Sequence, residues 1–349
     1  MAVSELGGIA EIEGWAEVRE RALPVRFARG TWYFARKKPL GFVCGLIVLF
    51  FMIIGDLVPE SANKVVKELN NLSSLAGIGD NPTSLGDSPV PYLADVLEKH
   101  TGIIHPYQKQ DIRHRLDKPF ETGQYVLGTD PIGRDVLSRL FYGARVAVVV
   151  AFGATFVASV LGAGLGISFA YYGGWLDKYA YRVVDVFQAL PGLVIYITIL
   201  GVFGSGLWQL VFVLGGLTGP LASRVNRGQA IQIMASPFIE AARVMGASDR
   251  RIMVRYLLPN VFPLIILGAT LGLGGFVLAE ATLSFLGYGL PPPFPSWGQM
   301  LQAEGRNNML TAPGLAIFPG LAIATLVFSF NLVGDALRDV LDPRLRGSR

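Results

Sequence analysis

Charged residues are scarce in this chain of 349 residues: Asp, Glu, Lys and Arg make up 16% of it, against 52% hydrophobic residues. The mean hydropathy is +0.46, which is too apolar for an ordinary soluble protein. The net charge of +4 does not indicate nucleic acid as a partner, because the basic residues stand beside apolar runs and form no basic face. We therefore expect a membrane protein.

Cysteine is almost absent as well. The single cysteine, Cys44, lies inside the first apolar run, which excludes an internal disulfide and a cysteine-based metal cage. A long polar stretch precedes that run, and no small-residue cleavage site follows it. We therefore expect the run to remain as an anchoring helix and not to be a cleaved signal peptide.

Motifs for nucleotide binding and catalysis are also missing. No Gly-Lys dipeptide occurs, so the chain lacks a phosphate-binding loop of the form GxxxxGK[ST]. It cannot itself be an ATPase that uses this loop. No nucleophile–base arrangement or catalytic carboxylate pair stands out, so we expect no catalytic residues. We also expect no metal site. His100, His105 and His114 leave metal binding as the alternative, although their spacing matches no familiar ligand motif.

Six apolar stretches are long enough to cross roughly 30 Å of hydrocarbon, which takes about 20 residues each. The fourth is interrupted by three glycines and Pro220, which membrane helices tolerate where neighbours satisfy the backbone. We predict an all-α polytopic membrane protein with six transmembrane helices and both termini on one side. The predicted spans are 39–58, 144–172, 177–204, 206–223, 262–287 and 314–336.

Basic residues predict the orientation of these spans. They cluster before the first span, between the fourth and fifth, and after the last, and the positive-inside rule makes those segments cytoplasmic. The polar connection between the first two spans is then an external subdomain, with a docking or lid role or as a partly ordered insertion. The predicted division is a cytoplasmic arm 1–38, a first helix 39–58, the external subdomain 59–127, a five-helix core 128–337 with a cytoplasmic loop 224–261, and a cytoplasmic tail 338–349.

Residues 240–260 are a polar interruption between apolar runs. Ser236 and Pro237 are typical of a helix start, and Gly246 is typical of a helix end in the left-handed conformation. Between them, the apolar positions recur at helical spacing and predict a narrow face that enters a groove of a partner; these positions are Phe238, Ala241, Ala242 and Met245. Ser248 or Asp249 would cap a second helix, which should give way to the next span at Pro259. The alternative is an amphipathic helix that lies on lipid headgroups.

Some polar residues fall in or beside the spans. Charges within a membrane normally face protein or water, so Glu280 and Asp185 either line a translocation path or make polar contacts between helices. Asp130, Arg134 and Asp135 begin an amphipathic segment just outside the second span, which lies at the interface or docks a partner. Trp297 follows a proline-rich stretch and suits an external docking surface.

Two pairs of glycines have the GxxxG spacing that lets helix backbones approach closely. Gly162 and Gly166 lie in the second predicted span, and Gly268 and Gly272 lie in the fifth. Either pair predicts close helix packing, within this chain or with a second one; the alternative is the general glycine richness of membrane helices.

Two sets of motifs resemble a known family. Residues of the polar interruption resemble the EAA loop of ATP-binding-cassette importer permeases, namely Glu240-Ala241-Ala242, Gly246 and Leu257-Leu258-Pro259. Tyr256 departs from that pattern, in which an isoleucine is usual. Motifs spread over about residues 128–345 resemble the C-type permease of oligopeptide, dipeptide and nickel importers: Gly128-Thr129-Asp130, Gly133-Arg134-Asp135, Leu278 to Gly289 (LAEATLSFLGYG), Pro295-Ser296-Trp297-Gly298, and Asn331 to Pro343 (NLVGDALRDVLDP).

The resemblance implies a type I importer permease fold without ATPase activity. It also implies that ATP and Mg²⁺ bind to two separate ATP-binding subunits, that a B-type permease pairs with this chain, and that an extracytoplasmic binding protein delivers substrate. Glu240, Ala241, Ala242 and Gly246, with Phe238 and Met245, would then couple ATP hydrolysis to transport. Peptides are the expected substrate; the alternatives are nickel or oligosaccharides, or a self-contained channel or secondary transporter with Glu280 and Asp185 as relay groups.

Overall fold

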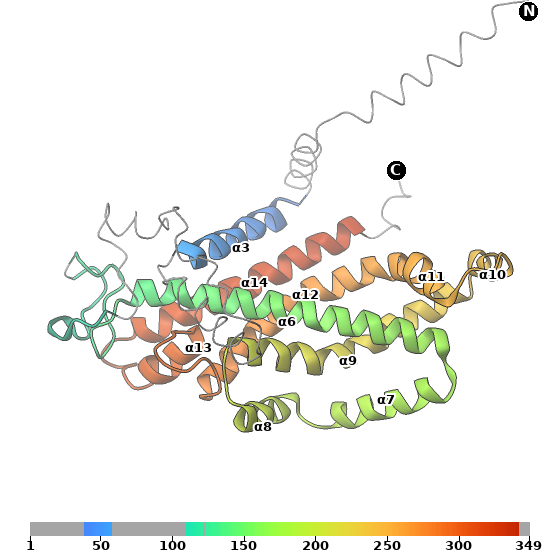
Figure 1. Ribbon diagram of the computed structural model, residues 1–349. Helices are drawn as coiled ribbons and strands as arrows, with labels where there is room; N and C mark the ends of the chain where they lie inside the picture. The colour runs from blue at the N-terminus through green and yellow to red at the C-terminus, as the bar shows by residue number, and fades with distance from the viewer. Residues whose placement is uncertain (1–37, 58–108, 122, 342–349) are drawn as a thin grey trace, which may run out of the picture.

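The computed structural model describes residues 38–57, 109–121 and 123–341. These residues contain helices and no β-strand, which confirms the all-α class. Figure 1 shows the long helices running side by side as an elongated bundle. The long helices are α3 (Pro39–Leu57), α6 (Val136–Tyr172), α7 (Gly174–Ala189), α8 (Gly192–Phe203), α9 (Leu207–Met234), α12 (Leu258–Phe285) and α14 (Gly314–Leu341); the short elements are η1 (Ile112–His114), α10 (Pro237–Val244), α11 (Asp249–Arg251), η2 (Ile252–Leu257), α13 (Trp297–Met300) and η3 (Leu301–Gly305).

By length and composition, three of the described helices can cross a membrane: Val136–Tyr172, Asp249–Phe285 and Gly314–Val340. A fourth span results if α7 and α8 are counted together. The apolar part of α3, Pro39–Ile53, is shorter, and α9 falls outside this set. The multi-pass architecture is therefore confirmed, whereas the count of six spans and the orientation of the termini stay predictions. Most of the external subdomain and most of both terminal segments lie outside the described residues.

The third predicted span is wrong as one straight helix. Helices α7 and α8 meet at an angle of 92°. The break falls at Leu190 and Pro191, where Leu190 is extended (φ −91°, ψ 143°). Proline disfavours the helical conformation of the residue before it and has no backbone N–H to continue the helical hydrogen bonds.

Helix α6 begins earlier than predicted. The Asp135 carboxylate accepts hydrogen bonds from the backbone N–H groups of Leu137 (3.1 Å) and Ser138 (3.2 Å) and so caps the helix. The amphipathic segment after Asp135 is thus not a separate interfacial helix, because it is continuous with the second span.

Glycines bring α6 and α9 together. A Cβ atom on Gly166 would lie 2.6 Å from the Ser223 carbonyl oxygen, and one on Gly162 would lie 3.1 Å from Ala222 Cβ. From the other side, a Cβ on Gly215 would lie 2.7 Å from the Ala154 carbonyl oxygen. This confirms the close packing predicted for the first glycine pair. A Cβ on Gly268 would meet nothing within 4 Å, so the second pair makes no such contact within the described chain.

Helix α9 continues through Pro220 to Met234, well past the predicted end at residue 223. The cytoplasmic loop predicted from residue 224 therefore begins after Met234. Arg224 and Arg227 lie on the helix, where they face α7.

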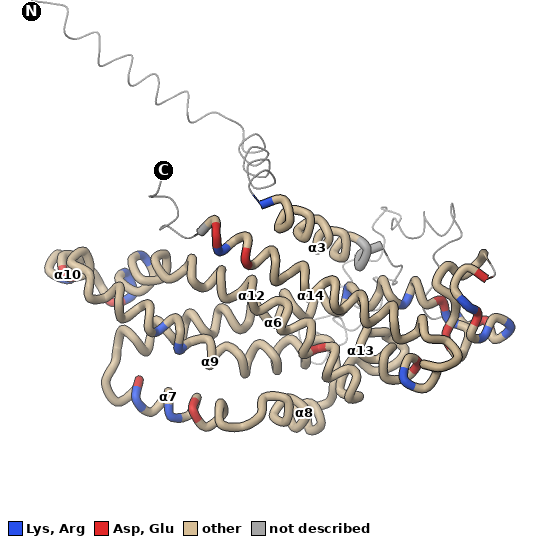
Figure 2. Tube along the Cα trace, turned by 180° about the vertical axis from the view of Figure 1, so that it is seen from behind, with Lys and Arg blue, Asp and Glu red and all other residues tan. Residues whose placement is uncertain are grey.

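Two apolar clusters stabilise the bundle. The larger joins residues of α6, α9, α12 and α14, including Val150, Leu214, Val277 and Leu326. The smaller lies at the end of the bundle that carries α10 and contains Ile167, Ala170, Ala230, Ile233, Ile239, Ile252, Leu257 and Val261. Figure 2 shows charged residues mainly at the two ends of the bundle and along α7 and α9. This distribution is typical of helices embedded in lipid.

Candidate functional site

The first candidate site is the protruding turn formed by α10, Gly246 and α11, at one end of the bundle (Figure 1). Pro237 occupies the first turn of α10, and Ser236 is extended before it (φ −81°, ψ 141°). The Ser236 side chain makes no capping hydrogen bond, contrary to expectation. Instead, its carbonyl oxygen accepts from the Ile239 N–H at 3.0 Å. Helix α10 thus starts where the sequence predicts, with its proline and not a serine hydroxyl as the local cause.

Gly246 ends this helix in the left-handed conformation, as predicted, with φ +78°. The Gly246 N–H donates to the Arg243 carbonyl at 2.9 Å, and the Ala247 N–H donates to the Ala242 carbonyl at 3.0 Å. These two bonds form a Schellman motif, which satisfies carbonyl groups at a helix end. The turn between the two short helices is therefore a defined structure and not a loose loop.

Helix α10 is anchored by its inner face. Ile239 is fully buried and Ala242 is 1% exposed. Ile239 packs in the smaller apolar cluster with Ile252 and Leu257 of η2 and Ile167 of α6. Ala242 therefore belongs to the anchoring face, which corrects its predicted place on the face offered to a partner.

The outer face of α10 is apolar and exposed. Val244 is 89% exposed, Met245 78% and Phe238 45%, and Ala241 and Glu240 are also exposed. Val244 was not predicted from the sequence, because it lies outside the i, i+3, i+4, i+7 positions counted from Phe238. We call Phe238, Ala241, Val244 and Met245 the outer patch. Apolar side chains this exposed at the end of a membrane bundle mark a contact with another molecule.

The second half of the turn is tied to α6 and α12. The Tyr171 hydroxyl donates to the Asp249 carboxylate at 2.7 Å, and the Arg243 guanidinium lies 5.7 Å from the centre of the Tyr171 ring. From Asp249 to Phe285 the chain is one helical run, passing through the π-helical turn η2. The prediction that the helix gives way at Pro259 is wrong, because the helical run continues from η2 into α12 without a break at that proline.

Glu280 lies at the opposite end of α12. It is 1% exposed and accepts a hydrogen bond from the Ser284 hydroxyl at 2.6 Å. The Ser296 hydroxyl, in the segment before α13, also hydrogen-bonds its carboxyl group. Glu280 is therefore near the carboxyl end of α12. Its contacts agree with the predicted alternative of a polar packing contact.

Asp185 does make a polar contact between helices. It pairs with Arg224 of α9, and both side chains are about half exposed. The Gln188 side-chain oxygen accepts from the same guanidinium at 3.0 Å. This favours the predicted helix–helix role of Asp185.

A cluster of charges closes the end of the bundle near Glu280. The Glu304 carboxylate accepts from Arg134 (2.7 Å) and from Arg139 (2.8 Å), and Arg134 also binds Asp130 at 2.5 Å. Asp130 is fully buried, and the Arg139 side chain is 2% exposed. Burial raises the pKa of the Glu304 carboxyl group, and the guanidinium of Arg139 acts in the opposite direction. The cluster links the loop before α6 to η3, and the sequence analysis missed Arg139 and Glu304.

The predicted external docking residues are mostly not available for docking. Asp130 and Asp135 are buried, and Trp297 is 1% exposed. The indole N–H of Trp297 donates to the Leu140 carbonyl at 2.8 Å, and its ring fits against Gly143, where a Cβ would lie 2.5 Å from it. Only Arg134 keeps some exposure. These residues hold loops onto the bundle, because the charges neutralise one another inside the fold.

The metal alternative rests on histidines of which only His114 is described. Its ring nitrogen Nδ1 lies 2.8 Å from the Asp117 carboxylate. His100 and His105 lie outside the described residues. Within the described residues no group of three potential metal ligands gathers.

Comparison with known proteins gives one family. Residues 158–347 match the binding-protein-dependent transport system inner membrane component family. The glutathione transport system permease protein GsiD of Escherichia coli O1:K1 is 40% identical over 224 residues, which are 64% of this chain and 74% of that protein. GsiD of Shigella boydii serotype 4 (strain Sb227) matches with the same identity and coverage. A solved structure of the MetNI methionine ABC transporter, in an inward-facing conformation, aligns with a TM-score of 0.47 and 20% identity over 59% of this chain and 97% of that chain.

Proposed function

The chain belongs to the family of binding-protein-dependent transport system inner membrane components, the permeases of ABC importers, and we propose that it imports short peptides and is driven through the outer patch of α10. As a family member it is a multi-pass inner-membrane permease and not itself an enzyme. The proposed partners are two ATP-binding subunits, a B-type permease and an extracytoplasmic binding protein. ATP and Mg²⁺ would bind to the ATP-binding subunits.

The observation that carries the coupling proposal is the division of α10 into two faces. Ile239 and Ala242 fix the helix to the bundle, while Val244, Met245 and Phe238 are left exposed on a rigid turn. The outer patch can enter a groove of an ATPase subunit, and that subunit can move the turn without unfolding it. Because Asp249–Phe285 is one helical run, such a movement would tilt α12 in the membrane.

The coupling proposal is tested by changing one face at a time. Val244→Asp should prevent copurification of the ATPase subunits, because a charge would have to be buried in their groove. It should leave the thermal unfolding of the chain unchanged, since Val244 is 89% exposed. Ile239→Ala should instead lower thermal stability, because that side chain is fully buried. Normal ATPase binding and peptide uptake in Val244→Asp would refute the assignment.

The substrate proposal rests on the relatives. The two reported relatives are glutathione transport permeases, and glutathione is a short peptide. Uptake of radiolabelled glutathione and dipeptides should be lost on deletion of this chain and restored by its expression. Competition by a nickel salt or an oligosaccharide, with no competition by peptides, would favour the alternative cargoes instead.

The rival class is a self-contained channel or secondary transporter. The contacts of Asp185 with Arg224 and of Glu280 with Ser284 leave neither carboxylate as an isolated relay group. Transport by the purified chain alone, in vesicles without ATP, would establish the rival and refute the importer proposal.

A further inference from the structure

Helix α7 is joined to α9 by two ion pairs. Asp177 forms two bonds with Arg227, from Nε at 2.6 Å and from Nη2 at 2.5 Å, and Asp185 pairs with Arg224. Between these pairs, the Tyr181 ring lies 5.2 Å from the Arg227 guanidinium. Both acidic residues of α7 are thus neutralised by arginines of the neighbouring helix.

Helix α7 also carries a group of exposed basic and aromatic side chains. Lys178 and Arg182, the only basic residues of the helix, are exposed and form no ion pair within the described residues. Trp175 is 74% exposed and Tyr179 is 60% exposed, and their ring centres are 6.5 Å apart. The spacing of Trp175, Lys178, Tyr179 and Arg182 is i, i+3, i+4 and i+7, which puts all four on one side of the helix. We call these four residues the basic aromatic face.

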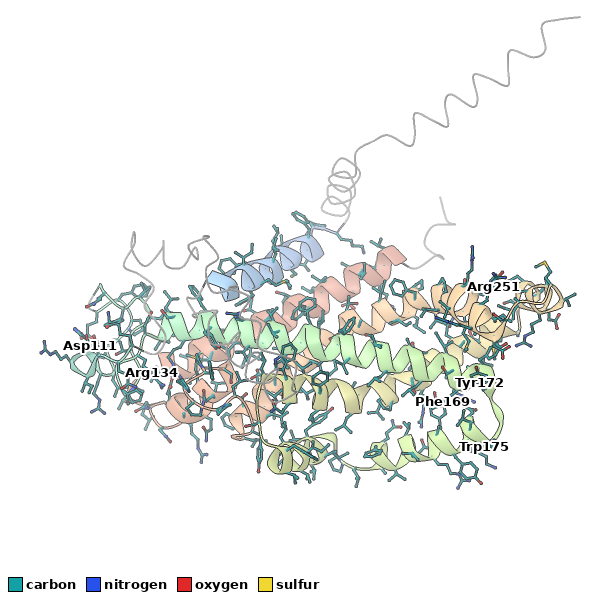
Figure 3. All side chains as sticks on the ribbon, viewed as in Figure 1. Asp111, Arg134, Phe169, Tyr172, Trp175 and Arg251 are labelled. Carbon is teal, nitrogen blue, oxygen red and sulfur yellow. The ribbon has the colours of Figure 1, made fainter. Side chains whose placement is uncertain are left out.

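The position of this face along the bundle is set by α6. Tyr171 bonds to Asp249 of α11, and the chain enters α7 three residues later at Gly174. The first turns of α7 therefore lie at the end of the bundle that carries α10. Figure 3 shows Tyr172 and Trp175 at the corner where α6 turns into α7, with Arg251 of α11 at the same end of the molecule.

We propose that the basic aromatic face of α7 binds anionic phospholipid headgroups of the leaflet at that end of the bundle. Tryptophan and tyrosine are enriched at the level of the headgroups, where one edge of the ring is apolar and the other is wet. Lysine and arginine beside them reach the phosphates and are attracted by anionic lipid. Since Asp177 and Asp185 are each paired with an arginine of α9, they leave the positive charges of Lys178 and Arg182 available to a ligand.

The charges of Lys178 and Arg182, unpaired within the described residues, favour lipid over a protein as the ligand of the basic aromatic face. Lys178 and Arg182 lie beside rings that are typical of a membrane interface, and a buried protein contact would leave these charges in need of matching carboxylates. The break at Pro191 separates α7 from α8, which carries no charged residue and suits the hydrocarbon region. Helix α7 is thus the charged half of the broken span, and α8 is the apolar half.

The test uses the assembled importer reconstituted in vesicles. Val183 lies next to the face and is 58% exposed, so Val183→Cys in a Cys44→Ala background accepts a fluorescent label without removing any of the four residues. Quenching by brominated phosphatidylglycerol is compared with quenching by brominated phosphatidylcholine, each mixed with the same unbrominated lipids. We expect stronger quenching by the anionic lipid. The preference should fall about fivefold for each basic group removed by Lys178→Gln or Arg182→Gln.

The matched control is the pair Lys109→Gln and Arg113→Gln, which removes the same charge from two exposed residues outside the helical bundle. That pair should leave the lipid preference unchanged. Equal quenching by the two lipids in the unsubstituted chain would overturn the proposal. So would a preference that survives the change of both Lys178 and Arg182.

A second measurement asks what covers the face. Photoreactive benzoylphenylalanine in place of Tyr179 leaves the other three residues of the face unchanged. It should cross-link to lipid in the assembled importer. Cross-linking to the second permease or another protein subunit would show that a protein covers the face and would overturn the lipid assignment. These outcomes do not depend on whether α10 couples to an ATPase, so the two proposals fail separately.

Discussion

Replacing Gly246 by alanine should loosen the turn that joins α10 to α11. A Cβ atom at this position would meet nothing within 4 Å, so no steric contact opposes the substitution. The backbone does oppose it, because φ is +78° and L-residues with a Cβ avoid that region. The penalty is thus purely conformational.

The size of the penalty follows from the left-handed conformation. A residue with a Cβ pays about 1–2 kcal/mol there, whereas asparagine tolerates it better. The two hydrogen bonds of the Schellman motif, at 2.9 and 3.0 Å, depend on that conformation. Their opening should therefore become about five to thirty times more frequent in Gly246→Ala, and less so in Gly246→Asn.

Hydrogen exchange read by mass spectrometry measures this opening directly, in the peptide that contains the Gly246 and Ala247 amides. Gly228→Ala is the matched control, because Gly228 is exposed, lies within α9 and has no atom within 4 Å of its would-be Cβ. Alanine there should leave exchange equal or slower. Equal exchange in Gly246→Ala and Gly246→Asn would refute the conformational explanation.

Two further predictions concern packing. Glu304→Gln should lower the free energy of unfolding by about 3–5 kcal/mol, because Arg139 is buried against that carboxylate. The control Glu121→Gln, at an exposed position, should change the free energy of unfolding little. Equal effects of the two substitutions would contradict the importance of the charge cluster. Gly166→Ala should destabilise the chain by about 1–3 kcal/mol, because its Cβ would lie 2.6 Å from a backbone oxygen of α9. Gly164→Ala should not destabilise the chain, because a Cβ atom there would have nothing within 4 Å. Indistinguishable melting temperatures of the two alanine variants would argue against close helix contact at Gly166.

Features that depend on neighbouring residues were predictable. The conformation of Gly246 and the start of α10 at Pro237 follow from local chemistry, and the structure confirms both. The close approach at Gly162 and Gly166 also follows from spacing along one helix. The errors at helix ends have local causes too: the Asp135 cap lengthens α6, and Pro191 breaks the third span.

Pairings between distant residues were not predictable. Glu304 binds Arg139, which is 165 positions away in the sequence, and no local pattern around either residue predicts this pairing. Asp130 and Trp297 were expected at a docking surface because polar and aromatic loop residues usually face solvent. The fold instead buries both residues, with Asp130 bound by Arg134 and the Trp297 indole donating to the Leu140 carbonyl.

The sequence by itself determined the membrane class, the absence of an ATPase motif and the helical turn around Gly246, because composition and local conformational preference are properties of the chain alone. Tertiary structure alone decided which side of each helix faces inward. In a soluble helix the polar side marks the surface, but a membrane helix is apolar on every side, so hydropathy cannot separate a lipid-facing residue from a packed one. Only the packing shows that Ala242 anchors α10 while Val244 is exposed, and that the acids of α7 pair with arginines of α9.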